Sequence, residues 1–439
     1  MSNEKLKNLT SKIGSGSTPR GGKSSYLEQG PYKLIRSQNI YNHYYTSDGL
    51  AYITNEQAEK LKNVSLEKRD ILINITGDSV ARTTIVENDM LPGRVNQHVS
   101  IIRCKENLLD PYYLLAFLTS KMTQSYLLSL AQVGGTRAAL TKGMLEQLDI
   151  PLLNYEKQKK IGKMLKIINE KINLNNSIIL SLEQLSQTLF KQWFIDFEFP
   201  NEEGKPYKSS GGEMLESELG NIPKNWTLSY FSNYVKHTVG GDWGKENVEK
   251  NYVEQVSIIR GADIPELIKG TDNKVPTRFI LKKNYENKKL LSGDIVIEIS
   301  GGSPTQSTGR SIFINKNIIS RYNDKVLCTN FCRIIRPVDF NKGIWLQIYI
   351  NYLYKKNVFF NFENGTTGIK NLDLNAVLNK YKIFSPSEDI IHLFSERMKV
   401  ILDSIQNLGM ENKRLANLRD TLLPKLLSGE IEIPDELEV

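Results

Sequence analysis

The chain has 439 residues, of which 40% are hydrophobic and 24% charged, a composition typical of a folded protein with room for two hydrophobic cores. Its formal net charge of +8 favours a polyanionic partner such as nucleic acid, although a basic globular protein without such a partner would look the same. Three scattered cysteines exclude a disulfide framework. Without a signal peptide or an apolar stretch of about 18 residues, we expect a cytoplasmic protein with no membrane contact.

The first half of the chain divides into a globular part and a long helix. Residues 1–150 alternate short β-type runs with Gly, Ser, Pro and Asn turns and a few helical stretches, which predicts a first globular domain. Residues 151–199 carry apolar side chains in alternating steps of four and three, the pattern of a coiled-coil helix. Residues 200–220 are polar and turn-rich, as expected of a linker.

The second half repeats the first. Residues 70–79 recur as residues 294–303, an offset of 224 (294 − 70), and the helical pattern recurs at an offset of 233 (394 − 161). We therefore expect a second globular domain at residues 221–385, a second long helix at residues 386–430 and an acidic tail at residues 431–439. Repetition of a domain together with its helix suggests a partner that is itself two-fold, and duplex DNA is the commonest such partner.

The two helices are expected to pair with each other. A helix of about 40 residues is about 60 Å long and would overhang its own domain, so its apolar seam needs a partner of equal length. The predicted fold class is α+β, with two similar globular domains in a pseudo-two-fold arrangement, separated by a long antiparallel two-helix coiled coil. Polar residues in the two seams either fix the register or mark where a partner docks: Asn175, Ser186, Asn412 and Arg419.

No stretch of the sequence forms a complete catalytic motif. Residues 16–24 approximate a phosphate-binding loop, but Ser17 stands where the first glycine is required. Residues 110–113 resemble the Asp-Pro-Pro-Tyr motif of adenine methyltransferases, but this chain has tyrosine in place of the second proline. Asp110 and Pro111 are better explained as the capped start of a helix. Residue 300 is serine where a nuclease strand would need lysine. We therefore expect no catalytic residues, no metal site and no bound cofactor.

Four segments give the chain a family resemblance. They are Asn-Ile-Pro-Lys-Asn-Trp at residues 221–226, Gln-Lys-Lys-Ile at residues 158–161, and the two helix ends at residues 189–197 and 422–431. With these segments in this order, the chain closely resembles the specificity subunit of type I restriction–modification enzymes. The first domain departs from the pattern, because it opens without a counterpart of the Ile-Pro-x-x-Trp segment at residues 222–226.

The resemblance implies a non-catalytic subunit that binds double-stranded DNA in a sequence-specific manner. Two target-recognition domains would each read one half of an asymmetric bipartite site. The helices would dock two modification (methyltransferase) subunits, and restriction (motor-nuclease) subunits could join. S-adenosylmethionine, ATP and Mg²⁺ would belong to those partners. The alternative is a coiled-coil scaffold that binds only proteins and reads no DNA.

Candidate DNA contacts are side chains of predicted loops whose chemistry suits a duplex, with Arg, Asn, Gln and His for base edges and Lys, Ser and Thr for phosphates. Arg36 and Arg260 occupy equivalent positions after apolar runs, and a structural ion pair would explain them equally well. The candidates in the first domain are Arg20, Lys23, Arg36, Gln38, Asn39, Arg82, Arg94, Asn96, Gln97, His98 and Arg137. Those in the second domain are Trp243, Lys245, Arg260, Gln306, Thr308, Arg310, Asn330 and Lys370.

Overall fold

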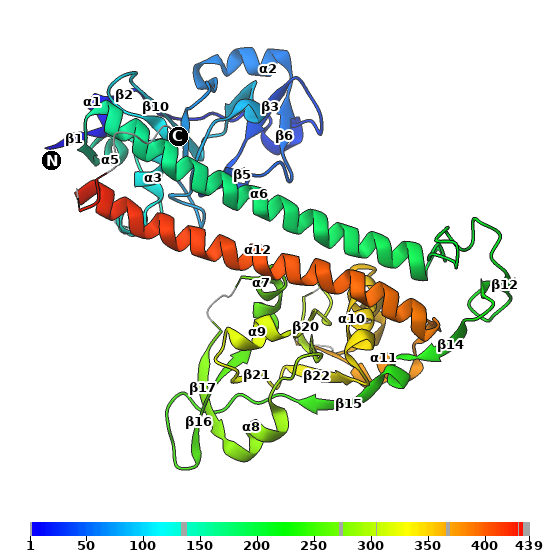
Figure 1. Ribbon diagram of the computed structural model, residues 1–439. Coiled ribbons are helices and arrows are strands. Elements are labelled where there is room, and N and C mark those ends of the chain that lie inside the picture. Colours follow the sequence, from blue (N-terminus) through cyan, green and yellow to red (C-terminus); the bar gives the residue numbers. More distant parts are fainter. Residues whose placement is uncertain are drawn as a thin grey trace. The chain divides into compact units, whose positions relative to one another are not determined.

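The computed structural model describes residues 2–132, 138–271, 275–303, 305–365, 369–428 and 430–432. The candidate Arg137 and most of the predicted acidic tail, residues 433–439, lie outside the described residues. Helices and strands both contribute to the fold (Figure 1), so the predicted α+β class is confirmed. The chain divides into two compact units, Met1–Leu174 with Arg414–Val439 (unit 1) and Asn175–Lys413 (unit 2).

Unit 1 is built mainly from short strands. They are β1 (Ser2–Lys5), β2 (Thr10–Ser15), β3 (Tyr32–Ile35), β4 (Ile40–Tyr41), β5 (Tyr44–Tyr45), β6 (Ala51–Ile53), β7 (Ile71–Asn74), β8 (Thr83–Ile85), β9 (Gly93–Val95), β10 (Val99–Cys104) and β11 (Asp149–Leu152). A four-stranded antiparallel sheet has the order β2-β10-β7-β8, and a three-stranded sheet has the order β6-β3-β9. Every side chain of β7 is buried, which explains why this strand is an unbroken run of apolar residues up to Asn74.

Short helices complete unit 1. They are α1 (Leu6–Leu9), α2 (Asn55–Lys60), α3 (Pro111–Thr119), α4 (Lys121–Gln132) and α5 (Lys142–Glu146). The Asp110 carboxylate accepts the Tyr113 N–H at 2.9 Å, and Pro111 stands at the first helical position. The capped helix start that the sequence predicted at this place is therefore confirmed.

Unit 2 contains a second, similar set of elements. Its strands are β12 (Met214–Leu215), β13 (Ile222–Pro223), β14 (Thr227–Tyr230), β15 (Val235–Gly240), β16 (Tyr252–Ile259), β17 (Thr277–Leu281), β18 (Ile295–Glu298), β19 (Ser300–Gly301), β20 (Ser311–Phe313), β21 (Val326–Cys328), β22 (Cys332–Pro337), β23 (Glu363–Asn364), β24 (Lys370–Leu372) and β25 (Lys382–Ser385). Its shorter helices are α7 (Ile264–Ile268), α8 (Lys282–Lys288), α9 (Lys316–Ser320), α10 (Phe340–Lys355) and α11 (Leu374–Lys380).

The strand order of unit 1 recurs in unit 2. The four-stranded sheet β15-β22-β18-β20 repeats β2-β10-β7-β8, and the three-stranded sheet β17-β16-β21 repeats β6-β3-β9. In both three-stranded sheets, the central strand runs parallel to the last one. The antiparallel pair of β14 with β25 likewise repeats that of β1 with β11. The duplication in the sequence therefore extends to strand order and strand direction.

One ion pair is built twice on these sheets. Arg103 donates to both oxygens of Asp70 at 2.7 and 2.8 Å, and Arg336 donates to both oxygens of Asp294 at 2.8 Å. Both carboxylates are buried, at 1% exposure each. A buried bidentate pair orients its strands strongly, since either partner alone would leave an uncompensated charge. The aspartates that open the repeated segments therefore serve the fold.

Two long helices, α6 (Tyr155–Phe194) and α12 (Glu388–Ser428), each contribute to both units. Within unit 1, the first half of α6 shares a hydrophobic cluster with the end of α12, including Ile161 and Leu426. Within unit 2, Asn175 donates to Asn412 at 2.9 Å, and the Trp193 ring lies 5.6 Å from that of Phe394. The paired segments within unit 2 therefore run in opposite directions (Figure 1).

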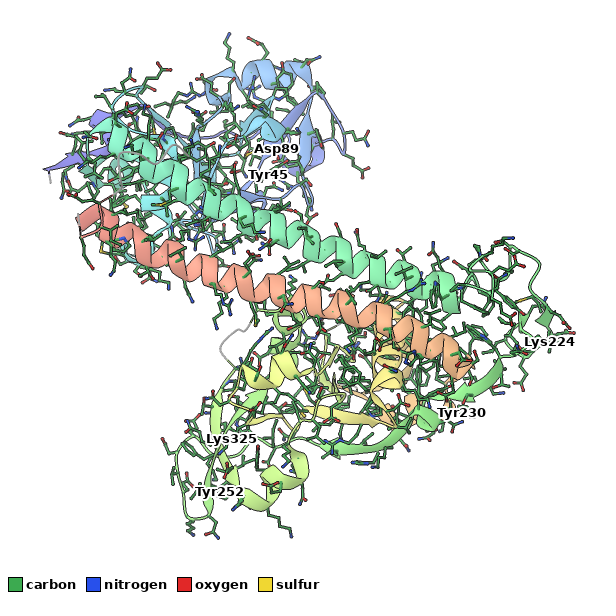
Figure 2. The ribbon with its side chains drawn as sticks, in the orientation of Figure 1. Tyr45, Asp89, Lys224, Tyr230, Tyr252 and Lys325 are labelled. Carbon is green, nitrogen blue, oxygen red and sulfur yellow. The ribbon has the colours of Figure 1, made fainter. Side chains whose placement is uncertain are left out.

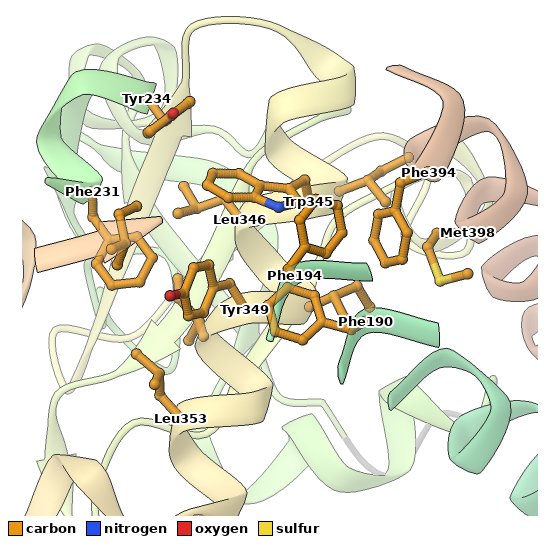
Figure 3. Close-up of a cluster of buried hydrophobic side chains, with 14 of the residues drawn as sticks. Phe190, Phe194, Phe231, Tyr234, Trp345, Leu346, Tyr349, Leu353, Phe394 and Met398 are labelled. Carbon is orange, nitrogen blue, oxygen red and sulfur yellow. The ribbon is translucent and has the colours of Figure 1, made fainter. Parts of the chain in front are cut away.

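Aromatic side chains fill the core of unit 2 where α6, α10 and α12 meet (Figure 3). The ring of Phe194 packs edge-on against that of Phe394 at 4.8 Å and lies 6.1 Å from Trp345. Such edge-to-face packing adds to the free energy gained by burying the rings. Within the part of the chain that the structure describes, no helix combines the length and apolarity that a membrane span requires.

Candidate nucleic-acid interface

Three loops converge at one edge of the four-stranded sheet of unit 1. β7 ends and β10 begins at this edge, with Asn74 opposite Val99. The Gly16 N–H donates to the Val99 carbonyl at 2.8 Å, and the Ile75 N–H donates to the His98 carbonyl at 2.9 Å. These backbone bonds hold the loops in a fixed arrangement. We call residues 16–20, 75–82 and 96–98 the loop edge of unit 1.

The same edge exists in unit 2. β18 ends and β22 begins there, with Glu298 opposite Cys332. The Ile299 N–H donates to the Phe331 carbonyl at 2.9 Å, and the Asp242 N–H donates to the Cys328 carbonyl at 2.9 Å. We call residues 241–245, 299–310 and 329–331, as far as the structure describes them, the loop edge of unit 2.

A glycine permits the close approach of the loops at each edge. A Cβ atom on Gly16 would lie 2.2 Å from the Val95 carbonyl oxygen, and one on Gly241 would lie 1.9 Å from the Thr329 carbonyl oxygen. Any side chain at either position would force the two backbones apart. Gly16, which begins the segment that resembles a phosphate-binding loop, is thus needed for the close contact between its own backbone and that of Val95.

Arg82 brings a positive charge to the loop edge of unit 1. Its backbone carbonyl accepts the Asn74 N–H at 2.9 Å, and its guanidinium lies 4.6 Å from the centre of the Tyr41 ring. Among the described residues, no carboxylate lies within ion-pair distance of this guanidinium. The half-buried side chain of Arg82 is therefore oriented by the aromatic ring and has no carboxylate partner among the described residues.

Gln97 and His98 form a hydrogen-bonded pair at the same edge. The His98 Nε2 lies 3.2 Å from the Gln97 Nε2, and its Nδ1 lies 2.6 Å from the Thr76 Oγ1. Because an amide nitrogen can only donate, the imidazole accepts through Nε2 and carries its proton on Nδ1. Gln97 is exposed and His98 half-buried. The exposed candidate Arg20 ends the first segment of this edge, and the exposed Lys23 and Gln38 belong to neighbouring segments.

Other candidates in unit 1 are held by the fold. The buried Asn39 amide donates to two backbone carbonyls at 3.1 Å, and the Arg94 guanidinium, 8% exposed, donates to two others at 3.2 and 2.9 Å. Burial lowers the pKa of Arg94. The buried Asn96 side chain accepts the His98 N–H at 3.3 Å. Half-buried Arg36 donates to a backbone carbonyl instead of a carboxylate.

The two candidate arginines of unit 2, Arg310 and Arg260, form ion pairs with carboxylates. Arg310 donates to both oxygens of Glu298 at 2.8 and 2.5 Å, and Arg260 donates to both oxygens of Asp263 at 3.0 and 2.7 Å. Hydrogen bonds to these carboxylates raise the pKa of both guanidinium groups. Of the two equivalent arginines at positions 36 and 260, the structure thus places only Arg260 in an ion pair with a carboxylate.

Two further candidates in unit 2 converge on one carboxylate. Glu363 accepts from Thr308 Oγ1 at 2.9 Å and forms an ion pair with Lys370 at 2.9 Å. Thr308 is fully buried, so its hydroxyl is not accessible to a ligand. Both residues stabilise the fold of this edge.

The remaining candidates of unit 2 are exposed. Trp243 is 38% exposed and lies under the Arg278 guanidinium at 4.4 Å. Lys245 lies 6.0 Å from the ring of Tyr252, which Figure 2 labels, and 3.6 Å from Glu249. Gln306 and Asn330 are also exposed.

Sequence reasoning missed two aromatic side chains at these edges, Tyr41 and Phe331. The Phe331 ring is 54% exposed beside Asn330. The long helices repeat at an offset of 233, and the strands β10 and β22 follow the same offset. Adding 233 to residue 98 gives residue 331, so this offset identifies Phe331 as the counterpart of His98. Within the described residues, no cluster of three or more His, Cys, Asp or Glu side chains is arranged to hold a metal ion.

The comparisons with known proteins point to one family. The type I restriction modification DNA specificity domain matches residues 5–184. The HindI specificity subunit of Haemophilus influenzae is 24% identical over 84% of this chain and 87% of its own length. The MjaIX specificity subunit of Methanocaldococcus jannaschii is 26% identical over 98% and 94%.

A solved structure shares the fold. The S subunit of a type I restriction–modification system from M. genitalium has a TM-score of 0.59 at 14% identity, covering 97% of this chain and 95% of its own. The likeness extends over both units, and the match to the DNA specificity domain, residues 5–184, lies mostly in unit 1 and ends within the α6 segment of unit 2. The chain is thus similar to type I restriction enzyme specificity subunits over most of its length, and residues 5–184 match the DNA specificity domain of that family.

Proposed function

We propose that this chain is the non-catalytic DNA-recognition subunit of a type I restriction–modification complex and reads an asymmetric bipartite site. The observation that carries the proposal is the loop edge, which is built twice on the same strand order with different side chains. Each edge would read one half-site. A recognition subunit needs this combination, because a constant frame can present different base contacts to each half.

The charges of the two edges support unequal half-sites. Arg82 and Arg310 follow equivalent strands, since each carbonyl accepts the N–H of the last residue of the preceding strand, Asn74 or Glu298. The carboxylate of Glu298 neutralises Arg310, whereas the Asn74 amide donates to the Ser37 carbonyl at 2.9 Å and leaves Arg82 its charge. One edge therefore offers DNA a cation where the other offers none.

Exposure divides the candidate residues. We propose that the exposed candidates, together with the half-buried Arg82 and His98, contact DNA. The others are buried, ion-paired or bonded to a backbone carbonyl, and we propose that they hold the loops. The proposed contacts are Arg20, Lys23, Gln38, Arg82, Gln97, His98, Trp243, Lys245, Gln306 and Asn330. The proposed loop-holding residues are Arg36, Asn39, Arg94, Asn96, Arg260, Thr308, Arg310 and Lys370.

The long helices would set the distance between the two half-sites. α6 has 40 residues and α12 has 41, so each is about 60 Å long. We propose target-recognition domains at residues 1–150 and 221–385, related by a pseudo-dyad and held apart by an antiparallel coiled coil. With each domain centre set inward from the helix ends, the half-sites would lie roughly one helical turn, about 34–36 Å, apart.

The helices would also dock the other subunits. In unit 1, Ile167 and Leu174 are 43% and 55% exposed, and in unit 2, Ile178 and Leu185 are 38% and 45% exposed. Each pair is seven residues apart and so lies on one helix face. We propose that these apolar faces bind modification subunits, two per complex, and that restriction subunits join them. Those partners would act with S-adenosylmethionine, ATP and Mg²⁺, and the complex would work in the cytoplasm.

Duplex binding at graded salt tests the proposal against the protein-only scaffold. The chain, purified with its modification subunits, is titrated onto labelled duplex DNA at 50 to 200 mM salt. Contacts from basic side chains to phosphates release counterions, so affinity should fall steeply as salt rises. No DNA binding at the lowest salt, in a complex that stays assembled, would favour the scaffold.

A further inference from the structure

The turns that begin β10 and β22 have the same backbone frame and different tips. Asn96 and Thr329 occupy the same position, because each donates its N–H to the last residue of the parallel strand beside it, at 3.1 and 2.9 Å. Each also accepts, through its side chain, the N–H two residues on, at 3.3 Å from His98 and 3.2 Å from Phe331. Gln97 and Asn330 are then the exposed tips.

The two turns share their backbone hydrogen bonds, so they differ mainly in the side chains that they carry. The next strand residue, Val99 or Cys332, donates back to Asn96 or Thr329 at 3.1 and 3.0 Å, which closes each turn in the same way. Because the backbone of the turn is fixed, a different residue at position 97 or 330 changes the chemical groups exposed there and leaves the position of the turn unchanged. This is the property expected of a specificity-determining element.

The two tips differ in chemistry. In unit 1, the amide of Gln97 bonds the His98 imidazole, which is itself anchored at 2.6 Å by Thr76. In unit 2, the position of His98 is taken by Phe331, whose ring is 54% exposed and cannot form such a hydrogen bond. A carboxamide pairs with the N6 and N7 atoms of adenine, and an exposed apolar ring suits the methyl group of thymine.

Resting on the proposed function, we infer that these two turns carry base readers. Gln97, oriented by His98, reads adenine in the first half-site. Asn330 reads adenine in the second half-site, and Phe331 contacts a thymine methyl group there. Discrimination at these base pairs thus comes from two residues in each domain, while the lysines and arginines around them position the phosphates.

The test uses the assembled complex and duplexes that carry the motif methylated in the host, together with every single base-pair change of it. Gln97→Ala should reduce discrimination about 10- to 100-fold at one adenine of the first half-site and leave the second half-site unchanged. Asn330→Ala should do the reverse. Glu106→Gln, an exposed change at the other end of β10, is the matched control and should leave all ratios unchanged.

Uracil probes the contact with the thymine methyl group. Replacing each thymine of the second half-site by uracil removes only that group, so the complex should bind one such duplex several-fold more weakly. Phe331→Ser should abolish the difference between thymine and uracil at that position. Because Phe331 is exposed, the substitution should leave assembly of the complex intact.

Two results would overturn the inference. One is a Gln97→Ala or Asn330→Ala complex that keeps every discrimination ratio, or that weakens for all duplexes equally. The other is an unmodified complex that does not distinguish thymine from uracil at any position. Failure of the proposed function looks different, because the unmodified complex would then show no motif to begin with.

Discussion

At the residue scale, we propose that an arginine at the loop edge is available to bind DNA only where no carboxylate of the fold pairs with it. Arg82 and Arg310 occupy equivalent positions in the backbone of the two units. Of the two, only Arg310 forms an ion pair with a carboxylate, that of Glu298. Glu298 is 3% exposed, so the ion pair is largely removed from water. The same residue type in the same position is therefore a proposed ligand contact in unit 1 and a structural group in unit 2.

The two arginines should respond oppositely to truncation. Arg82→Ala should weaken duplex binding by about 1–2 kcal/mol and leave the free energy of unfolding nearly unchanged. Arg310→Ala should instead lower the free energy of unfolding by about 3–5 kcal/mol, because a buried carboxylate loses its cation. Duplex titration and urea unfolding separate the two effects. Equal unfolding midpoints for Arg310→Ala and the unmodified chain would contradict this account.

His43 gives unit 1 a dependence on pH. Burial and the nearby Arg419 cation lower the pKa of His43 to about 3. Its Nδ1 lies 3.2 Å from the Asn169 Nδ2, whose N–H it accepts, so protonation would place two donors against each other. The unfolded chain takes up this proton near pH 6.5, whereas the folded chain does so only near pH 3. Stability should therefore fall as the pH falls between these values.

A variant isolates this contribution from other titrations. His43 has a φ of 71°, a backbone conformation that asparagine tolerates, so His43→Asn should fold. Urea midpoints are compared at pH 7.5 and pH 5. The unmodified chain should lose more stability than His43→Asn, with a difference approaching about 1.4 kcal/mol per pH unit below pH 6. An equal loss in both chains would show that His43 titrates normally.

The sequence predicted which polar residues lie on the loops, but it did not predict the side chains to which these residues are hydrogen-bonded. Arg310 was a candidate because a cation on a loop suits DNA. Nothing in the linear sequence indicated that Glu298 would bind it across the strand pair. Phe331 was missed because the repeat offset changes from 224 to 233 between β18 and β22, so residues 98 and 331 align only at the offset that the long helices follow.

At the element scale, the long helices followed from periodicity more directly than the sheets did. Apolar steps of four and three predicted helices at residues 151–199 and 386–430, and α6 and α12 occupy Tyr155–Phe194 and Glu388–Ser428. A helix repeats its pattern locally, so one stretch of sequence suffices. Strand order depends on contacts between distant segments, as in the pairing of β2 with β10, and local pattern does not encode them.

The polar pair in the helix seam of unit 2 should show strong coupling. Asn175 is fully buried and donates to Asn412 at 2.9 Å and to Glu411 at 2.8 Å. Asn175→Leu alone should cost about 1–3 kcal/mol, because a buried amide loses its partner. Adding Asn412→Leu should recover much of that loss. A double-mutant cycle by urea unfolding measures this, and simple additivity of the two costs would contradict it.

The exposed apolar face of α6 in unit 2 should be required for assembly. Ile178→Glu with Leu185→Glu places two charges where we propose that a modification subunit packs, and should abolish co-purification of that subunit. Both residues are exposed, so the free energy of unfolding should stay within about 0.5 kcal/mol of the original. Gln184→Glu, on another face of the same helix, is the control. Undiminished co-purification of the double variant would refute the docking face.

At the scale of the whole molecule, duplication would explain how one chain could read the two different half-sites that we propose. The strand order of the main sheets, the Asp–Arg ion pairs and the loop-closing glycines are the same in both units, so each unit builds the same frame. The exposed side chains at the tips of the turns, Gln97 and Asn330, differ between the units, while the backbone hydrogen bonds that close each turn are the same. The asymmetric bipartite target that we propose would suit such a chain.

The most direct measurement of this account is the pattern of methylated adenines in host DNA, read by single-molecule sequencing with and without the gene. We expect deletion to remove methylation from one bipartite motif with unequal halves and an unread spacer, and reintroduction of the gene to restore it. An unchanged pattern, in cells that demonstrably contain active modification subunits, would contradict DNA recognition by this chain.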